Sequence, residues 1–215
     1  MDADCAAPLA RREVRRSWFI TGAVVLASLT GVAPVGATAP GSLPQTRIEP
    51  SFAAPLTRQM QILVRAIALD SPALGATVFF PRGAYLQMKM GTIPDPSSDY
   101  AQRLVAFFDL DLTAYHERLF MGPRSTLLRV STNRALAAWI SPGACENRIG
   151  YWYAPRVRLV LRRAGTVVSV AVASLISWRS VWYVVHLGPN PRPLNVGTVD
   201  DFRRGPGTPG PGGGC

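Results

Sequence analysis

The chain has 215 residues, and 48% of them are hydrophobic, which is enough to bury the core of one globular domain and excludes a wholly polar, unfolded chain. Its 23 basic and 13 acidic residues give a formal net charge of +10 at pH 7. Every basic residue except Lys89 is an arginine, and with the many Ala, Gly and Pro this is typical of a GC-rich genome before it indicates phosphate recognition.

Residues 1–37 have the layout of a secretory signal peptide. A basic segment at 11–16 precedes an apolar stretch at 18–32, and small residues around Ala37 favour cleavage after it. The segment 15–19 also matches part of a twin-arginine export signal. A membrane-spanning helix needs about 20 apolar residues, so the apolar stretch is short for an anchor. We therefore expect a secreted, extracytoplasmic protein, the alternative being a membrane anchor formed by an uncleaved N-terminal helix.

Cysteine usage fits export. Cys5 would leave with the signal, so that Cys145 and Cys215 remain in the mature chain. In an oxidising compartment these two residues can form a disulfide. The bridge would close a loop of about 70 residues and stabilise the fold by roughly 4 kcal/mol. The alternative is that Cys215 stays free or pairs elsewhere.

The rest of the chain divides into a linker, one domain and a tail. Residues 38–55 contain four prolines and predict a Pro-rich linker. Residues 56–196 are expected to form a single domain. Residues 197–215 predict a Gly/Pro-rich flexible tail, because they have little apolar surface to bury.

The first half of this domain has helical periodicity. Residues 56–69 place apolar side chains on one stripe, and 73–80 predict a shorter helix, whereas 85–89 predict a turn or short strand. The N-cap region 96–99 begins the longest predicted helix, which runs to about residue 121. One face of that helix carries Leu104, Phe108, Leu112, Tyr115 and Leu119.

The second half has strand patterns joined by short turns, which predict consecutive hairpins. The expected strands are 126–132, 136–140, 149–153 leading into 156–163, 167–178 and 181–187. Alternation along 156–163 turns Val157, Leu159 and Leu161 toward the core and Arg156, Arg158 and Arg162 outward. Helices first and strands after predict an α+β fold, in which N-terminal helices pack on a C-terminal antiparallel β-meander.

This order resembles the nuclear transport factor 2-like superfamily, a cone-like α+β roll. The residues that carry the resemblance are 78–81 after the early helices, the helix over 100–119, and the last strand Trp182–Leu187. The whole chain also resembles a family of uncharacterised exported proteins of high-GC Gram-positive bacteria, which implies no activity. Catalytic members of the superfamily place Asp, Tyr or His in the hollow between helices and sheet.

That resemblance singles out a set of candidate residues: Tyr85, Asp111, Tyr115, His116, Arg179 and His186. A carboxylate near a tyrosine in an apolar hollow can abstract a proton or activate water, because burial raises its pKa. A small hydrolase or lyase would thus use Asp111 with Tyr115 or His186. In the structural alternative Asp111 forms a buried ion pair with an arginine. His186 shares a strand face with Trp182, so it either enters the hollow or lies at an exposed edge.

No metal, cofactor or nucleophile motif accompanies these candidates. Two histidines 70 residues apart, with no carboxylate at ligand spacing, predict no metal site. The glycines lack the strand–turn–helix context of a phosphate-binding loop. We therefore expect neither a metal nor a cofactor.

The net positive charge of the domain comes from its second half. Residues 122–196 hold ten arginines and one acidic residue, whereas 40–121 are neutral. The strand pattern predicts a basic sheet face of Arg129, Arg156, Arg158, Arg162 and Arg163. After export such a face suits an envelope component or partner protein, including an anionic lipid or wall polymer, and nucleic acid is not expected. The alternative is a solvated surface without a partner.

These features favour an exported, cell-envelope-associated binding module without catalytic activity, which uses either the basic sheet face or the hollow. The hydrolase or lyase with an Asp-Tyr/His pocket is the alternative function.

Overall fold

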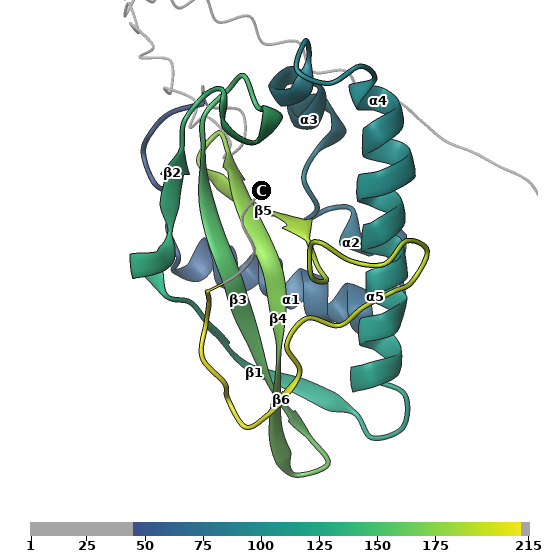
Figure 1. The fold of residues 1–215 in the computed structure, drawn as a ribbon. Helices are drawn as coiled ribbons and strands as arrows, with labels where there is room; N and C mark the ends of the chain where they lie inside the picture. Colours follow the sequence, from purple (N-terminus) through teal and green to yellow (C-terminus); the bar gives the residue numbers. More distant parts are fainter. Residues whose placement is uncertain (1–44, 212–215) are drawn as a thin grey trace, which may run out of the picture. The chain divides into compact units, whose positions relative to one another are not determined.

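The computed structural model describes residues 45–211 and has the expected α+β architecture, with helices packed against a six-stranded antiparallel sheet (Figure 1). Helices occupy the first half of the described chain and strands the second. The predicted fold class is confirmed. The signal peptide predicted over 1–37 lies outside the described residues.

The helices form one layer, and α1 and α5 are the longest of them (Figure 1). In α1, Leu56, Met60, Leu63 and Ile67 are buried, as the apolar stripe predicts. The single long helix expected over 96–121 is instead α4, a π-helical segment η1 and α5 in succession. The bounds are α1 Ala54–Ala68, α2 Pro72–Gly75, α3 Arg82–Lys89, α4 Pro96–Asp99, η1 Tyr100–Val105 and α5 Ala106–Leu119.

The sheet is built on the two long strands β3 and β4. Both β1 and β2 pair with β3 on one side, and both β5 and β6 pair with β4 on the other. The strands are β1 Ser125–Ser131, β2 Ala138–Ile140, β3 Tyr151–Arg163, β4 Thr166–Trp178, β5 Val181–His186 and β6 Arg203–Arg204. Residues 78–80, predicted as the end of a helix, instead extend this sheet: Phe80 N–H donates to the Val184 carbonyl at 2.9 Å.

Both hairpin turns are two residues long and require left-handed backbone. Ala164 and Gly165 have φ values of 48° and 77°, and Arg179 and Ser180 have 48° and 65°. Positive φ at both turn positions matches the right-handed twist of the flanking strands. The turns predicted at Gly165 and Arg179-Ser180 therefore fix the β3–β4 and β4–β5 pairings.

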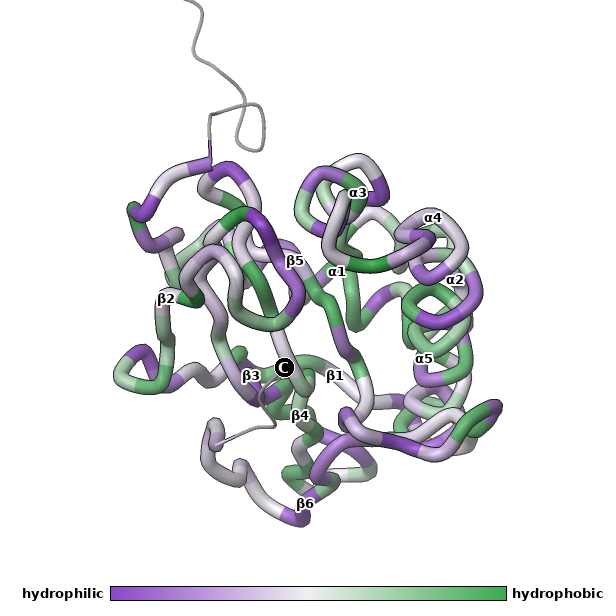
Figure 2. Tube along the Cα trace, turned by 45° about the horizontal axis from the view of Figure 1, so that its top comes forward, coloured by the Kyte–Doolittle hydropathy of each residue, from purple (hydrophilic) through white to green (hydrophobic). Residues whose placement is uncertain are grey.

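The core lies between the helices and one face of the sheet. Val157, Leu159 and Leu161 of β3 belong to the same buried cluster as the apolar faces of α1 and α5. Figure 2 shows both hydrophobic and hydrophilic positions along α5, as an amphipathic helix on a sheet requires. The central strand β4, by contrast, is buried at nearly every position and therefore on both faces.

The predicted linker contributes to the domain from residue 45 onward. The Gln45 side chain donates to the Gly150 carbonyl at 2.9 Å and accepts from Arg179 N–H at 2.7 Å. Trp182 Nε1 donates to the Pro50 carbonyl at 3.1 Å, and the Trp182 ring lies 4.9 Å from that of Phe52. These partners were missed because prolines were taken to indicate a spacer, although Pro also occupies extended segments that pack on a domain.

The prediction of a flexible tail over 197–215 is wrong for its described part, because Gly197 and Thr198 contact α5 and residues 200–210 are hydrogen-bonded to the sheet (Figure 1). Asp200 accepts through its carbonyl from Ala171 N–H at 3.0 Å, and β6 pairs with Val168 and Ser169. Farther on, the Gly210 N–H donates to the Arg156 carbonyl at 3.2 Å.

Arg158 is the residue that this C-terminal segment covers. Its side chain is 0% exposed, donates to Asp201 at 2.6 Å and to Ser169 at 2.8 Å, and touches Gly207. A Cβ at Gly207 would come within 2.5 Å of Arg158 Nε, and the φ of Gly207 is +58°. Glycine at this position thus allows the backbone to lie on the guanidinium.

We predict that Arg158→Met releases the C-terminal segment. The Gly205 N–H, bonded to the Val167 carbonyl at 2.7 Å, should exchange with solvent at least about tenfold faster, since each 1.4 kcal/mol lost is tenfold in the opening equilibrium. Amide hydrogen exchange measures this. Arg162→Met, on the same strand face but exposed, is the matched control and should leave the exchange unchanged. Equal protection in both variants would contradict the role given to Arg158.

Candidate functional site

A cavity of about 690 Å³ lies between α3, η1 and the ends of the strands. Its wall is mostly apolar and aromatic, and a smaller set of polar side chains enters from α3, η1, β4 and β5. The apolar lining includes Met88, Ile93, Leu104, Ile140, Ile176 and Val185. A concave apolar pocket of this size with a few convergent polar groups is the usual form of a small-molecule site.

A hydrogen-bonded triad of Tyr85, Asp99 and Arg103 forms one wall. Arg103 binds Asp99 in a bidentate manner, with Nε–Oδ1 at 2.6 Å and Nη2–Oδ2 at 2.7 Å, and donates to the Tyr85 hydroxyl at 3.1 Å. The Tyr85 hydroxyl in turn donates to Asp99. The Arg103 hydrogen bonds lower the pKa of Asp99, whereas burial, followed by the hydrogen bond to Asp99, raises that of Tyr85.

The π-helical segment η1 brings Arg103 of this triad to the cavity. It spans Tyr100–Val105 and contains both Arg103 and Leu104 of the wall. The Tyr100 hydroxyl donates to the Phe80 carbonyl at 2.8 Å and ties η1 to the chain that extends the sheet. π-Helical turns are rare and occur frequently at functional sites.

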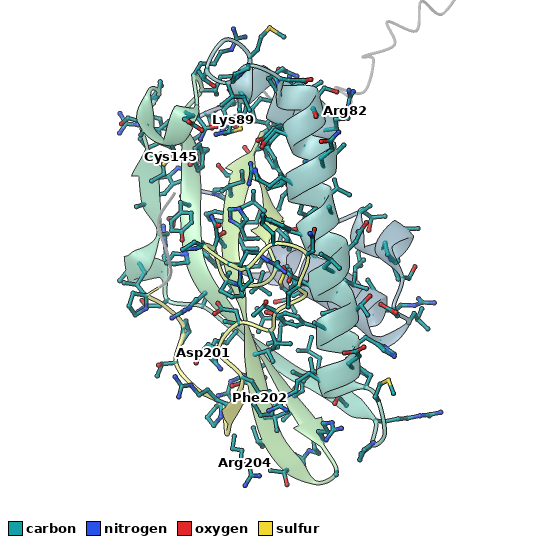
Figure 3. The ribbon with its side chains drawn as sticks, turned by 45° about the vertical axis from the view of Figure 1, so that its right-hand side comes forward. Arg82, Lys89, Cys145, Asp201, Phe202 and Arg204 are labelled. Carbon is teal, nitrogen blue, oxygen red and sulfur yellow. The ribbon has the colours of Figure 1, made fainter. Side chains whose placement is uncertain are left out.

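Lys89, the last residue of α3, lines the same cavity beside the loop of Cys145 and Glu146 (Figure 3). Its ammonium donates to the Cys145 carbonyl at 2.7 Å and lies 3.9 Å from a Glu146 carboxylate oxygen. Burial lowers the pKa of Lys89. Cys145 is disulfide-bonded, and Cys215, the partner that the sequence predicts, lies outside the described residues.

His186, at the end of β5, lines the cavity, so of the two orientations left open by the sequence it takes the inward one. The face that the sequence predicts His186 to share with Trp182 and Val184 is changed by a bulge, because His186 pairs with Ser174 whereas Val184 pairs with the next residue of β4, Leu175. His186 Nδ1 lies 2.8 Å from the Ser174 hydroxyl. Burial, and then the positive charge of Arg103, lowers the pKa of His186 to about 4, so the ring is neutral at neutral pH.

Asp111 does not line this cavity. The carboxylate is 1% exposed, forms an ion pair with Arg192, and accepts from Gly188 N–H at 2.8 Å and Thr198 N–H at 2.9 Å. The geometry is that of the structural alternative, a buried ion pair with an arginine. The arginine comes from the segment after β5 and not from the sheet.

Tyr115 is likewise structural. Its hydroxyl, fully buried, lies 2.5 Å from the Ala171 carbonyl and 2.9 Å from the Leu187 carbonyl and accepts from Asp200 N–H at 2.9 Å. The predicted Asp111–Tyr115–His186 pocket therefore does not form, because Asp111 and Tyr115 are hydrogen-bonded to backbone groups outside the cavity. His116, bonded to the Ile67 carbonyl at 2.9 Å, and Arg179, over the Trp178 ring, do not line the cavity either.

The charged cavity residues Lys89, Asp99 and Arg103 are among those that sequence reasoning missed. Asp99 was placed among the N-cap positions, but Asp95 caps α4 by accepting from Ser98 N–H at 2.9 Å. The i,i+4 spacing of Asp99 and Arg103 was available as a signal for the pair. The chain's single lysine among 22 arginines was the other signal.

The predicted basic sheet face does not exist as a continuous surface. Arg158 is buried beneath the C-terminal segment, Arg156 pairs with Asp200 at 3.1 Å, and Arg163 donates to the Leu119 and Met121 carbonyls at the end of α5. Arg129 and Arg162 alone of the five are exposed. The strand alternation is correct, but the outward side chains meet acidic residues that follow β5.

Within residues 45–211, no group of three His, Cys, Asp or Glu side chains is placed to hold a metal ion. No helix of that part of the chain has the length and apolar character needed to cross a membrane. Comparisons with protein-family models, curated proteins and solved structures find no match to this chain.

We predict that His186 makes the fold acid-sensitive. The folded protein keeps this ring neutral down to about pH 4, whereas the unfolded chain protonates it near the ordinary value of 6.5. The unfolded state therefore binds the extra proton between these values, and the unfolding free energy should fall by about 2–3 kcal/mol as pH drops through that window. Arg103, Arg192 and Lys89 are the charged groups that contribute to this shift.

Urea unfolding at pH 7 and pH 4.5 tests this expectation. His186→Gln should lose about 2–3 kcal/mol less than the wild type over this interval. His116→Gln, which replaces the other histidine and keeps His186, is the control and should lose stability as the wild type does. An unchanged loss in His186→Gln would contradict the assignment.

We also predict that Asp111→Asn destabilises the fold by about 3–5 kcal/mol, because it leaves the Arg192 guanidinium buried without a countercharge. Arg192 has a side chain 3% exposed, and its Nε has no partner among the described residues. Asp109→Asn, two residues earlier on α5 and outside any ion pair that the described residues form, should cost less than about 0.5 kcal/mol. Chemical denaturation measures the unfolding free energy of both variants. Similar losses in the two would contradict a stabilising role for the Asp111–Arg192 ion pair.

Proposed function

We propose that this protein is an exported module that binds a small amphiphilic molecule of the cell envelope in the cavity between its helices and its sheet. The observation that carries the proposal is a solvent-accessible cavity of about 690 Å³ lined mainly by apolar and aromatic side chains. A concave, mostly apolar pocket of this size is the usual form of a small-molecule site.

The ionisable groups of the wall favour binding over acid–base catalysis. An acid–base catalyst needs a group whose pKa lies near the working pH. Here the pKa of His186 is lowered to about 4, that of Asp99 is lowered, and that of Tyr85 is raised. Each of these three shifts moves a pKa away from neutral pH, whereas burial lowers that of Lys89 toward it. Asp111 and Tyr115, the predicted partners of a hydrolase or lyase, lie elsewhere.

The cavity is also a better binding site than the sheet face. Three of the five arginines proposed for that face are already bonded to the C-terminal segment or to the end of α5. An anionic polymer would have to displace Asp200 and Asp201 before it reached Arg156 and Arg158. A ligand can enter the cavity without displacing any of these ion pairs.

Export is supported by the layout of residues 1–37 and by the disulfide at Cys145, since disulfides persist in oxidising compartments. The resemblance to the nuclear transport factor 2-like superfamily stays part of the proposal. Members of that superfamily use the hollow between helices and sheet, which is where this cavity lies.

Filling the cavity should abolish binding. We expect Ile176→Trp, which projects an indole into the space from β4, to weaken binding of a neutral naphthylamine dye by at least about tenfold. The dye's fluorescence rises in apolar surroundings, so titration with the wild type and the variant gives both affinities. Unfolding in urea checks that the variant is folded.

Val167→Trp is the matched control, a β-branched residue on the same strand that does not line the cavity. This variant should bind the dye as the wild type does. The proposal fails if the wild type does not bind the dye, or if the folded Ile176→Trp variant binds it as well as Val167→Trp.

A further inference from the structure

The only lysine of the chain lies in the wall of this cavity, where its charge is poorly balanced. The Lys89 side chain is 13% exposed, and the nearest carboxylate oxygen, from Glu146, is 3.9 Å from Nζ. That distance is too long for a hydrogen bond. The Glu146 side chain is 71% exposed, so water screens most of its attraction for the ammonium.

The ammonium also retains hydrogen-bonding capacity. It has three N–H donors, and the one hydrogen bond that it makes within residues 45–211 goes to the Cys145 carbonyl. A compact ammonium on a flexible stem can direct the remaining donors toward a ligand in the cavity. An arginine here would present a wide, planar fork instead.

The other charges of the cavity interior do not balance Lys89. Arg103 and Asp99 neutralise each other through their bidentate contact, and Asp95, which also lines the cavity, caps α4 by accepting from Ser98 N–H. Arg192, which also acts on His186, is paired with Asp111. Of the two cations in the cavity wall, Lys89 is thus the one without a carboxylate oxygen at hydrogen-bond distance.

Apolar surface surrounds this single positive group. Ile93, Leu104, Ile140 and Ile176 line the remaining space. A ligand that neutralises Lys89 and also buries apolar surface gains from both interactions, whereas a purely polar anion gains from the first alone.

From this juxtaposition we infer that the cavity takes an amphiphile with one compact anionic group, a carboxylate or a phosphate, bound by the Lys89 ammonium, with its apolar part against Leu104 and Ile176. This inference rests on the proposed binding function and names the chemical class of the ligand. Arg103 and Asp99 form the fixed wall beside the head group, and His186 stays neutral at the other side.

Displacement of the neutral dye at pH 7.5 tests the inference with four probes of equal chain length: decanoate, decyl phosphate, decanol and decyltrimethylammonium. We expect at least one anion to displace the dye from the wild type at a concentration about tenfold or more below that of decanol, since a hydrogen bond to a charged group supplies this much. The cation should be the weakest. Comparing decanoate with decyl phosphate distinguishes the two head groups.

Substitution of Lys89 gives the second arm. In Lys89→Met the advantage of the anions over decanol should disappear, while dye and decanol still bind because the apolar wall remains. Lys89→Arg keeps the charge and should keep part of the advantage. The matched control Arg82→Met removes a cation from the same helix at a position outside the cavity wall and should leave the order of the probes unchanged.

The two failures are distinguishable. Equal displacement by decanol and the anions, or an anion preference that survives in Lys89→Met, overturns the head-group inference while dye binding upholds the cavity as a site. If the dye does not bind to the wild type, the proposed function falls and the inference falls with it.

Discussion

The buried carboxylate of Asp111 is the constraint on which the cavity depends. It accepts from Gly188 and Thr198 and pairs with Arg192, so it fixes the chain immediately after β5 to α5. Since β5 ends at His186, this attachment also constrains a side chain that lines the cavity. Asp111, a candidate catalytic acid in the sequence, thus influences the cavity indirectly, by positioning the backbone that follows β5.

Acidic residues distributed along the chain explain why a strongly basic sequence does not present a basic sheet. Asp200 and Asp201 follow the arginine-rich half and return to Arg156 and Arg158, while Glu49, before α1, pairs with Arg134 at 2.6 Å. A buried arginine requires such a partner, because the desolvation cost of an unpaired guanidinium is several kcal/mol. Charge counted over a window of sequence therefore overstates the charge of the folded surface.

The elements and the inward or outward side of each strand could be predicted from periodicity, because one buried face determines the α1 stripe and the alternation along β3. The cavity could not be, because it depends on where α3 and η1 lie relative to β4, and no local pattern encodes that distance. Arg158 was assigned to the correct side of its strand, yet the segment that buries it lies some 43 residues later and reads as a Gly/Pro-rich tail. Gly207 was part of that tail signal, although its missing side chain is what lets the segment contact Arg158.

Two charged sites of similar chemistry thus have opposite roles in this fold. At Asp111 the carboxylate has three donors, all from the segment that follows β5, and these contacts hold that segment in place. At Lys89 the ammonium is nearly as well removed from water, but its carboxylate neighbour stays in solvent at 3.9 Å. A buried charge that the fold satisfies stabilises the fold, whereas one left partly satisfied beside open volume lowers the free energy of a ligand that brings the missing charge. This difference in hydrogen bonding and charge pairing, and not burial or charge alone, is why we give Asp111 a structural role and propose ligand binding for Lys89.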